Sequence, residues 1–346
     1  MRKTVLPLVT LLISGLMGLT LLAPWIPPRM FWPSLFAAYG FVYLFPLLIL
    51  LLVYWVRPPH PWALLPLILI LFSLPALDRH ISLRIGSTDH PDQALVIATF
   101  NTHALQQLRV SPKGGSRVDR EKSVQLFPPD MQPDLVCLQE VPLNYQPRGP
   151  DWGISNSYLF RHKNSLLVSR YPIREKGKKS FELSGNSVAW ADIATPLGLI
   201  RVFNVHLQSN RISQDADQLV NAPIDDARTW TGWRAVLRKV RSSTRLREEQ
   251  ALWLAEAIRN SPHPTLVAGD FNDTPQSYTY RMIRQGLHDS FEQGGMGFGT
   301  TFAGRIPGLR IDFILSSTDL QFSDHRVAPV RLSDHYPVLA RVALAK

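Results

Sequence analysis

The chain has 346 residues, of which 45% are hydrophobic and 18% charged, and its formal net charge is +10. This length leaves room for more than one domain, and the overall composition is that of an ordinary globular protein. The single cysteine, Cys137, excludes an intramolecular disulfide; it lies in the apolar run LVCL, where a small core residue is commoner than a reactive thiol.

The first 77 residues differ in composition from the rest, with four basic residues and no acidic one. Apolar stretches cover residues 4–23, 35–56 and 62–77. At about 1.5 Å per residue the first two would cross a hydrocarbon core of about 30 Å, whereas the third reaches only about 24 Å. No small-residue cleavage site follows the first stretch, which argues against a signal peptide. We therefore expect residues 1–77 to form a transmembrane anchor, with three helices.

Basic residues near the ends of these stretches bear on the topology. The start MRK favours a cytoplasmic N-terminus, so three spans would place the rest of the chain on the extracytoplasmic side. Arg57 in the second loop agrees with this arrangement, and Arg29 in the first loop opposes it. If the third stretch does not cross, the remainder faces the cytoplasm instead.

Residues 78–93 are polar without sustained periodicity and predict a linker, followed by a globular domain over residues 94–346. In that domain, short apolar runs rich in Val, Ile, Phe and Leu predict strands. They are ALVIATFNTH, PDLVCLQEV, NSLLVSRYPI, SVAWADIAT, LIRVFNVHLQS, PTLVAGDFN, RIDFILSS and YPVLARVAL. The clearest helix covers residues 247–259, with apolar positions on one face. This alternation predicts an α/β sandwich of two sheets flanked by helices.

Polar side chains stand at the ends of these predicted strands. Two carboxylates from separate strands could hold a hard divalent cation such as Mg²⁺, and Mn²⁺ would fit the same oxygens. Histidines could transfer protons or bind phosphate, and an aspartate could fix a histidine tautomer. In GDFN, Asp270 and Asn272 are two residues apart, so an extended chain would project them to one side. The candidates are Asn101, Glu140, His206, Asp270, Asn272, Asp312, Asp334 and His335.

The segments IATFN, CLQE, NVHLQS, AGDFNDTP, RIDFIL and SDHYPV occur in this order. The series resembles the endonuclease/exonuclease/phosphatase superfamily over roughly residues 94–345, nearly the whole part that follows the anchor. An anchor followed by such a domain is also similar to a group of bacterial membrane proteins of this superfamily found in Bacteroidetes. The resemblance implies a four-layered α/β sandwich of the deoxyribonuclease type, a Mg²⁺-dependent phosphoesterase and, for this chain, a multi-pass protein of the bacterial inner membrane.

The resemblance also implies roles for the candidates. Glu140 would be the principal metal ligand, with Asn101 nearby to bind a metal water or phosphate, and Asp334 in or just outside the metal shell. Asp270 would be the general base and, with Asn272, would position the attacking water and a phosphoryl oxygen. His335, oriented by Asp312, would contact the scissile phosphate. His206 would touch the phosphate or help the leaving group.

Each assignment has a structural alternative. Asp270, Asn272 and Asn101 could cap turns at strand ends, because Asp and Asn hydrogen-bond their own backbone there. Glu140 alone could be a surface acid, and His206 a buried histidine with satisfied partners. His103 follows Asn101 at strand spacing but has no counterpart in the motif series, so we expect a solvated or packing role for it.

The substrate class stays open between a lipid headgroup and nucleic acid. Two basic clusters, within residues 161–179 and 234–247, would attract a phosphate backbone. CLQEV, however, lacks the basic residue that several DNA-cutting relatives carry after this glutamate. Trp230, Trp233, Leu237 and Val240 recur at helical spacing among basic residues and could rest on an anionic lipid surface, or pack in a core. A monoesterase acting on an inositol-phosphate-like substrate and a non-catalytic membrane-tethered scaffold are the alternative functions.

Overall fold

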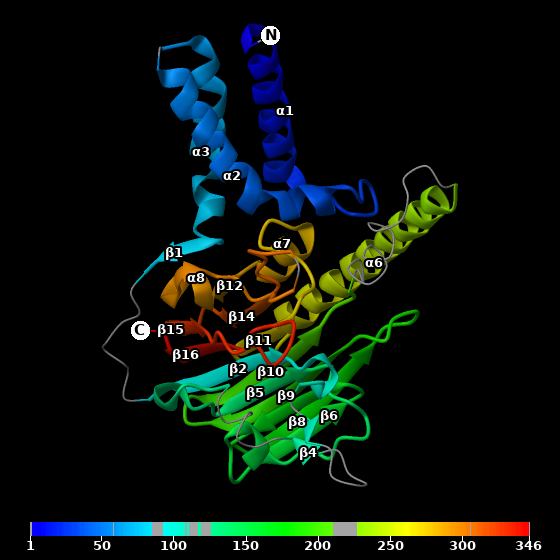
Figure 1. Cartoon of the computed structure of the whole chain (residues 1–346). Helices are drawn as coiled ribbons and strands as arrows, with labels where there is room; N and C mark the ends of the chain where they lie inside the picture. The colour runs from blue at the N-terminus through cyan, green and yellow to red at the C-terminus, as the bar shows by residue number, and fades with distance from the viewer. Residues whose placement is uncertain are drawn as a thin grey trace. The chain divides into compact units, whose positions relative to one another are not determined.

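The structure is a computed structural model that describes residues 2–57, 59–84, 93–107, 109–110, 117–118, 126–209, 227–304 and 306–345. The chain divides into two compact units. The helical unit comprises Met1–His80, Ser209–Glu249 and Asp273–Met282, and the sheet unit comprises Ile81–Gln208, Gln250–Asn272 and Ile283–Lys346. Figure 1 shows the helices of the first and the strands of the second.

Three apolar helices, α1 (Arg2–Leu22), α2 (Ser34–Val56) and α3 (Leu64–Leu77), begin the helical unit. Short 3₁₀ turns at Ala23–Trp25 and Pro61–Ala63 lie in the two connections. Only α1 and α2 are long and apolar enough to cross a membrane, among the residues that the structure describes. The third predicted stretch, of 16 residues, gives the shorter helix α3, because its first residues form the 3₁₀ turn Pro61–Ala63.

The three helices pack on one another and leave apolar side chains on the outside. Met17, Phe45 and Ala76, one from each helix, belong to a single buried cluster. Outward-facing residues of the same helices include Leu12, Leu50 and Phe72, which are 63%, 64% and 72% exposed. A surface of this kind is unfavourable in water and favourable in a hydrocarbon phase.

Helix α6 (Ala227–Arg259) begins 20 residues before the helix expected from residue 247. Its first part gives little apolar periodicity, because its buried positions include Thr244 and Arg247 as well as Val236 and Val240. Both valines pack against Leu35 of α2, so Val240 is a core residue of the helical unit. Leu237 is 40% exposed, and the Trp230 side chain lies outside the described residues.

Two mixed six-stranded sheets form the sheet unit, in the orders β12-β14-β11-β10-β9-β8 and β15-β16-β2-β5-β7-β6. β10 and β11 are parallel, as are β2 and β5, and the other neighbours are antiparallel. The strands of the first sheet are β8 (Ile173–Ser180), β9 (Ser187–Thr195), β10 (Gly198–His206), β11 (Thr265–Asp270), β12 (Leu287–Asp289) and β14 (Asp312–Ser317). Those of the second are β2 (Leu95–Asn101), β5 (Leu135–Gln139), β6 (Tyr158–His162), β7 (Ser165–Ser169), β15 (Leu320–Val327) and β16 (Val338–Leu344).

The eight predicted apolar runs all contain strands, which confirms that part of the interpretation. β8 (IREKGKKS) forms an edge strand despite its charges, most of which are exposed. Charged side chains on an edge strand discourage pairing with another chain. The smaller elements are β3 (Arg109–Val110), β4 (Arg117–Val118), α7 (Tyr278–Arg284), α8 (Ser290–Gly294), and the 3₁₀ turns His103–Leu105, Pro129–Met131 and Gly149–Trp152.

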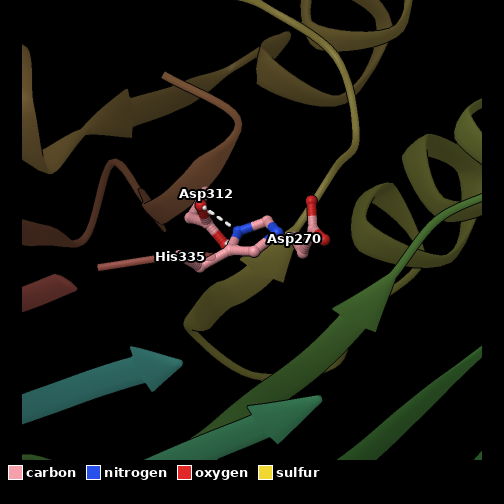
Figure 2. A group of neighbouring side chains, drawn as sticks. All are labelled: Asp270, Asp312 and His335. Atoms are coloured by element: carbon pink, nitrogen blue, oxygen red, sulfur yellow. Dashed lines mark hydrogen bonds and ion pairs between the residues drawn. The ribbon is translucent and has the colours of Figure 1, made fainter. Parts of the chain in front are cut away.

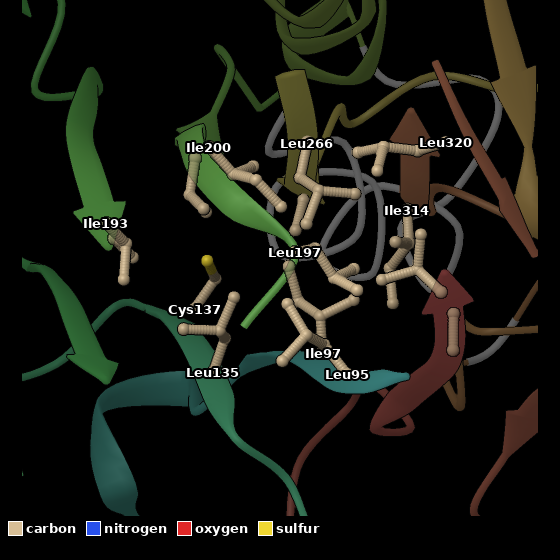
Figure 3. Close-up of a cluster of buried hydrophobic side chains, with 14 of the residues drawn as sticks. Leu95, Ile97, Leu135, Cys137, Ile193, Leu197, Ile200, Leu266, Ile314 and Leu320 are labelled. Carbon is tan, nitrogen blue, oxygen red and sulfur yellow. The ribbon is translucent and has the colours of Figure 1, made fainter. Parts of the chain in front are cut away.

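The main core lies between the two sheets and takes side chains from both (Figure 3). Ile97 and Leu135 come from the second sheet, and Ile200 and Leu266 from the first. Cys137 is buried among them, and burial raises the pKa of its thiol, as expected for a core residue. A second cluster, with Phe100 and Trp152, packs against the other face of the second sheet. This packing fixes the strand ends that carry the polar candidates.

The predicted linker, residues 78–93, contains a short strand, β1 (Ile81–Leu83), which pairs antiparallel with β13 (Met296–Phe298). β1 has only three residues, Ile81, Ser82 and Leu83. Its alternation of apolar and polar side chains is too short to predict a strand from the sequence. Residues 85–92 lie outside the described part of the chain.

Candidate active site

Strand pairing brings most of the polar candidates to one place. In the first sheet, Asp270 at the end of β11 is the register partner of His206 in β10 and of Asp312 in β14. In the second sheet, Asn101 ends β2 opposite Gln139 of β5, and Glu140 is the next residue. The two groups meet, because Asn101 Nδ2 donates to Asp270 Oδ2 at 3.0 Å and contacts Glu140 Oε1 at 3.3 Å.

His335 lies between two buried carboxylates (Figure 2). Its Nδ1 is 2.9 Å from Asp312 Oδ2, and its Nε2 is 3.8 Å from Asp270 Oδ2. Burial alone would lower the pKa of His335, but Asp312 and Asp270 raise it to about 10. The two carboxylates therefore favour the cationic form of the imidazole.

Burial also raises the pKa of Asp270, and the charge of Asp312 adds to the effect, against His335, His206 and Asn101, which lower it. A carboxyl group with a raised pKa is a stronger base than an ordinary one and is suited to accept a proton near neutral pH. Asp270 is fully enclosed, so any water that it activates must sit on the side that faces its polar neighbours.

The side chains of Asp270, Asp312 and His335 are close enough together to hold a metal ion. His335 Nδ1 is engaged by Asp312, and its Nε2 faces Asp270, so the imidazole is held between the two carboxylates. We therefore interpret this group as an Asp-His-Asp charge network. The carboxylates of Glu140 and Asp334 are 34% and 40% exposed, so their oxygens are more accessible to an incoming cation.

His206 is 4% exposed, and neither of its ring nitrogens has a hydrogen-bond partner in the described part of the chain. Its Nε2 lies 3.7 Å from Glu140 Oε1 and 3.9 Å from Asp270 Oδ2. An unpartnered buried imidazole is costly unless a ligand completes its hydrogen bonds. This arrangement differs from the structural alternative, a buried histidine with satisfied partners.

Asn272 holds Asp270 in place. The backbone N–H of Asn272 donates to Asp270 Oδ1 at 2.8 Å, and its side-chain amide donates to Asp270 Oδ2 and to the Leu207 carbonyl. Asn272 has a φ of 53°, so it turns out of the strand and does not continue an extended chain. Glu140 also has a positive φ, of 56°, a strained conformation for a non-glycine residue that clusters at functional sites.

Asn101 and Asp334 take positions that qualify their expected metal roles. Asn101 Oδ1 accepts from the His103 backbone N–H, so the side chain presents its NH₂ group, a donor, to the two carboxylates. Asp334 Oδ1 lies 3.3 Å from His103 Nδ1. His103, for which we expected a packing or solvated role, is therefore a neighbour of the site, and its spacing from Asn101 was the only sequence signal.

Two hydroxyls that sequence reasoning missed support these residues. Thr301 Oγ1 accepts from the backbone N–H groups of Ile311 and Asp312. Ser333 Oγ donates to the Asn101 carbonyl at 2.8 Å and contacts Asp334 Oδ1 at 3.2 Å. Both are buried, and neither belongs to a predicted strand.

Two family models match the chain. The model of the Endonuclease/Exonuclease/phosphatase family matches residues 98–335, and that of a domain of unknown function (DUF8431) matches residues 2–80. None of the curated proteins compared matches the chain.

Several solved structures resemble the chain at low sequence identity. An endonuclease/exonuclease/phosphatase from Beutenbergia cavernae is 20% identical, with 73% of this chain and 72% of that chain covered and a TM-score of 0.47. A family protein from Bacteroides thetaiotaomicron is 16% identical, with 73% and 96% covered and a TM-score of 0.48. The mannosyl-6-phosphatase Bt3783 of the same organism is 18% identical, with 72% and 100% covered and a TM-score of 0.49. The family model spans more than half of the chain and every polar candidate found at the strand ends, so this chain belongs to the endonuclease/exonuclease/phosphatase family.

Proposed function

We propose that the protein is a membrane-anchored, divalent-metal-dependent phosphoesterase that hydrolyses a phosphodiester by in-line attack of water. The observation that carries the proposal is the group at the strand ends: a cationic His335 between Asp270 and Asp312, beside the unpartnered His206 and the accessible carboxylate of Glu140. Such a site offers a base, two imidazoles and oxygen ligands around one small volume.

The donor set suits Mg²⁺ or Mn²⁺. Glu140 would be the principal ligand and Asp334 a second carboxylate, while Asn101 would bind a metal water or a phosphoryl oxygen through its NH₂ group. When bound, the cation would supply Lewis acidity that neutralises charge on the phosphoryl oxygens. Hard oxygen ligands with free lone pairs are what such cations prefer.

The protons are handled by the protein's own side chains. Asp270, fixed by both N–H donors of Asn272, would accept a proton from the attacking water. His335, oriented by Asp312, would donate an Nε2–H hydrogen bond to a phosphoryl oxygen and stabilise the charge that develops there. His206 would contact the phosphate or protonate the leaving oxygen.

The anchor belongs to the same proposal. The exposed apolar faces of α1, α2 and α3 support a multi-pass anchor. With a cytoplasmic N-terminus and three crossings, the protein would lie in a bacterial inner membrane with the catalytic domain on the extracytoplasmic side. We also propose the full four-layered sandwich and the division into an anchor (residues 1–77), a linker (78–93) and a catalytic domain (94–346). A lipid headgroup is the favoured substrate and nucleic acid the second; an inositol-phosphate-like monoester is the alternative.

Hydrolysis of bis(p-nitrophenyl) phosphate by the purified full chain tests the reaction. Mg²⁺ should support turnover and a chelator should abolish it. Asp270→Ala and His335→Ala should each lower kcat/KM by about 100- to 10,000-fold, the usual contribution of a general acid or base. Asp319→Ala and His162→Ala, which lie outside the site, serve as matched controls. Turnover that is indifferent to the first two substitutions would support the non-catalytic scaffold instead.

The substrate class is tested with a panel under the same conditions. Plasmid DNA, RNA, sphingomyelin, phosphoinositides and a soluble inositol phosphate are offered to the wild-type protein and to Asp270→Ala. Preferential hydrolysis of a lipid diester is expected; cleavage of nucleic acid alone, or of the monoester alone, would reassign the substrate.

A further inference from the structure

The segment Asp273–Met282, within the helical unit, begins directly after Asn272 and is rich in buried polar side chains. Asp273, Thr274 and Gln276 are each 2–3% exposed. Polar groups that are withdrawn from water to this extent need partners within the protein. Their partners identify what this segment is built to contact.

Two of these side chains bind backbone carbonyls of the apolar helices. Gln276 Nε2 donates to the Thr20 carbonyl at 3.1 Å, and Thr274 Oγ1 donates to the Ala38 carbonyl at 3.2 Å. Because α1 ends at Leu22, the Thr20 carbonyl is among the last four of the helix, which lack an intrahelical partner. Gln276 thus caps the end of the first apolar helix.

The same segment is held from α6. Arg247, which is fully buried, places its Nε 3.3 Å from Asp273 Oδ2. The neighbouring Glu248 accepts from the Arg29 backbone N–H at 2.8 Å and pairs with the Arg29 guanidinium, in the connection between α1 and α2. Asp273 and Thr274 are therefore fixed by a buried ion pair and by the hairpin of α1 and α2.

Covalent connection carries this constraint to the site. Asp270 is the last residue of β11, and only three residues separate it from Thr274, which limits their Cα atoms to about 14 Å in any arrangement of the two units. Asn272, which makes two hydrogen bonds to Asp270, lies within this short link in a conformation with positive φ.

We propose that the apolar hairpin is a positioning element of the catalytic site, acting through Thr274 and Gln276, in a segment that Arg247 of α6 also holds, on Asn272 and so on Asp270. None of the three is a catalytic residue, since none belongs to the group at the strand ends. This inference rests on the proposed function and adds to it that the anchor is required for turnover as well as for attachment to a membrane.

The test compares full-length proteins reconstituted in the same lipid. Thr274→Val and the double variant Thr274→Val/Gln276→Met remove the donors to the hairpin. We expect kcat for bis(p-nitrophenyl) phosphate to fall about threefold in the single and about tenfold or more in the double variant, because small displacements of a base are costly, with KM changed less than twofold. Hydrogen exchange at the backbone amides of residues 271–274 should become faster in parallel.

Two controls separate positioning from general damage. Thr274→Ser keeps the hydroxyl and should restore both kcat and slow exchange. Thr10→Val removes a threonine hydroxyl of α1 that bonds Leu6 and Trp55, with no bond to the segment among the described residues, and should leave kcat and exchange unchanged. The single variant keeps the test decisive if the double variant does not fold.

The outcomes are distinguishable from failure of the proposed function. If the wild type hydrolyses none of the substrates, the proposed reaction is wrong, and the exchange data still decide whether the hairpin orders residues 271–274. If the wild type is active and folded variants retain wild-type kcat and exchange, the positioning role is wrong.

Discussion

Charge at the site is governed by a few residues, of which Asp312 is the most informative. It contacts His335 directly and faces Asp270 across paired strands, so its carboxylate raises the pKa of both groups. The two effects serve the proposed reaction together, because Asp270 must be ionised and His335 protonated at the same pH.

Asp312→Asn should therefore move the whole pH profile of kcat/KM to lower pH. The acid limb moves to lower pH because the pKa of Asp270 decreases. The alkaline limb moves to lower pH because His335 loses a counter-charge, which lowers its pKa by about 1–3. Rates of bis(p-nitrophenyl) phosphate hydrolysis from acid to alkaline pH measure both limbs, with Asp319→Asn as control. An unchanged alkaline limb would contradict the assignment to His335.

His325, away from the site, gives a prediction about stability. It is buried with its Nδ1 2.8 Å from Ser290 Oγ, and burial lowers its pKa from 6.5 to about 3, an effect that Arg310 reinforces and Asp289 opposes. Below pH 6.5, His325 is protonated in the unfolded chain but stays neutral in the folded protein. The free energy of unfolding therefore decreases as the pH falls toward 3. The loss is at most about 1.4 kcal/mol per pH unit.

Chemical unfolding of the full chain at a series of pH values measures this slope. His325→Gln cannot titrate and should give a shallower decline between pH 6.5 and 4, even if its stability at neutral pH is lower. Equal slopes for the two proteins would show that His325 does not remain neutral in the folded state.

At the scale of elements, β11 depends on Gly269. The residue lies inside the strand, with a φ of +153°, and not in the turn after it; a Cβ there would meet the Val205 carbonyl oxygen of β10 at 1.9 Å. The close approach of β10 and β11 is what makes His206 and Asp270 register partners.

Gly269→Ala should therefore destabilise the fold by about 2–5 kcal/mol, through overpacking and backbone strain, and should lower activity in the fraction that folds. Gly198→Ala is the matched control, since Gly198 also has a positive φ, of +101°, but has open space around its Cβ position. Thermal unfolding of both variants separates the cost of a positive φ, which both share, from the steric clash with Val205, which only Gly269→Ala has. Similar losses for the two would contradict the role assigned to Val205.

The elements also show what could be predicted from the sequence. Apolar runs located eight strands, and the polar residue after each run located most of the site, because strand ends are marked by an abrupt change in side-chain type. Asn204 was missed: it lies inside such a run, yet it is buried and bonds Gln139 and the carbonyls of Leu138 and Leu166, on the opposite sheet. Only the packing of the two sheets gives it partners.

Other parts could not be predicted because their cause is long-range. The apolar residues from Trp230 to Val240 were recognised at helical spacing, but their continuity with the helix from residue 247 was not. The buried Val236 and Arg247 contact Leu35 and Asp273 from distant segments. Thr301 lies in no quoted motif, and Ser333 begins SDHYPV without a role of its own having been assigned to it. The importance of both follows from the backbone groups that the fold brings to them.

At the scale of the whole molecule, the third apolar helix would decide which side of the membrane carries the proposed reaction. α3 is short, but it exposes apolar side chains such as Leu71 and Phe72, 57% and 72%, as a lipid-facing helix would. With a cytoplasmic N-terminus, three crossings place the catalytic domain outside the cytoplasm.

Reporter fusions measure this topology. Alkaline phosphatase joined after Lys346 should be active and green fluorescent protein at the same position dark, because only the first matures outside the cytoplasm. Fusions after His60, which follow two crossings, should show the reverse and act as the control. Fluorescence without phosphatase activity at Lys346 would reduce the proposed anchor to two spans.

The short link between Asp270 and Thr274 also bears on which substrate concentration sets the rate: the surface mole fraction or the bulk molarity. For a protein anchored as proposed, the base stays close to the bilayer surface and meets a lipid ester by lateral diffusion. Its rate would then follow the mole fraction of that lipid in the surface, and diluting it with inert lipid would slow turnover at constant bulk amount. A dissolved ester would instead follow bulk molarity, whatever the composition of the surrounding lipid.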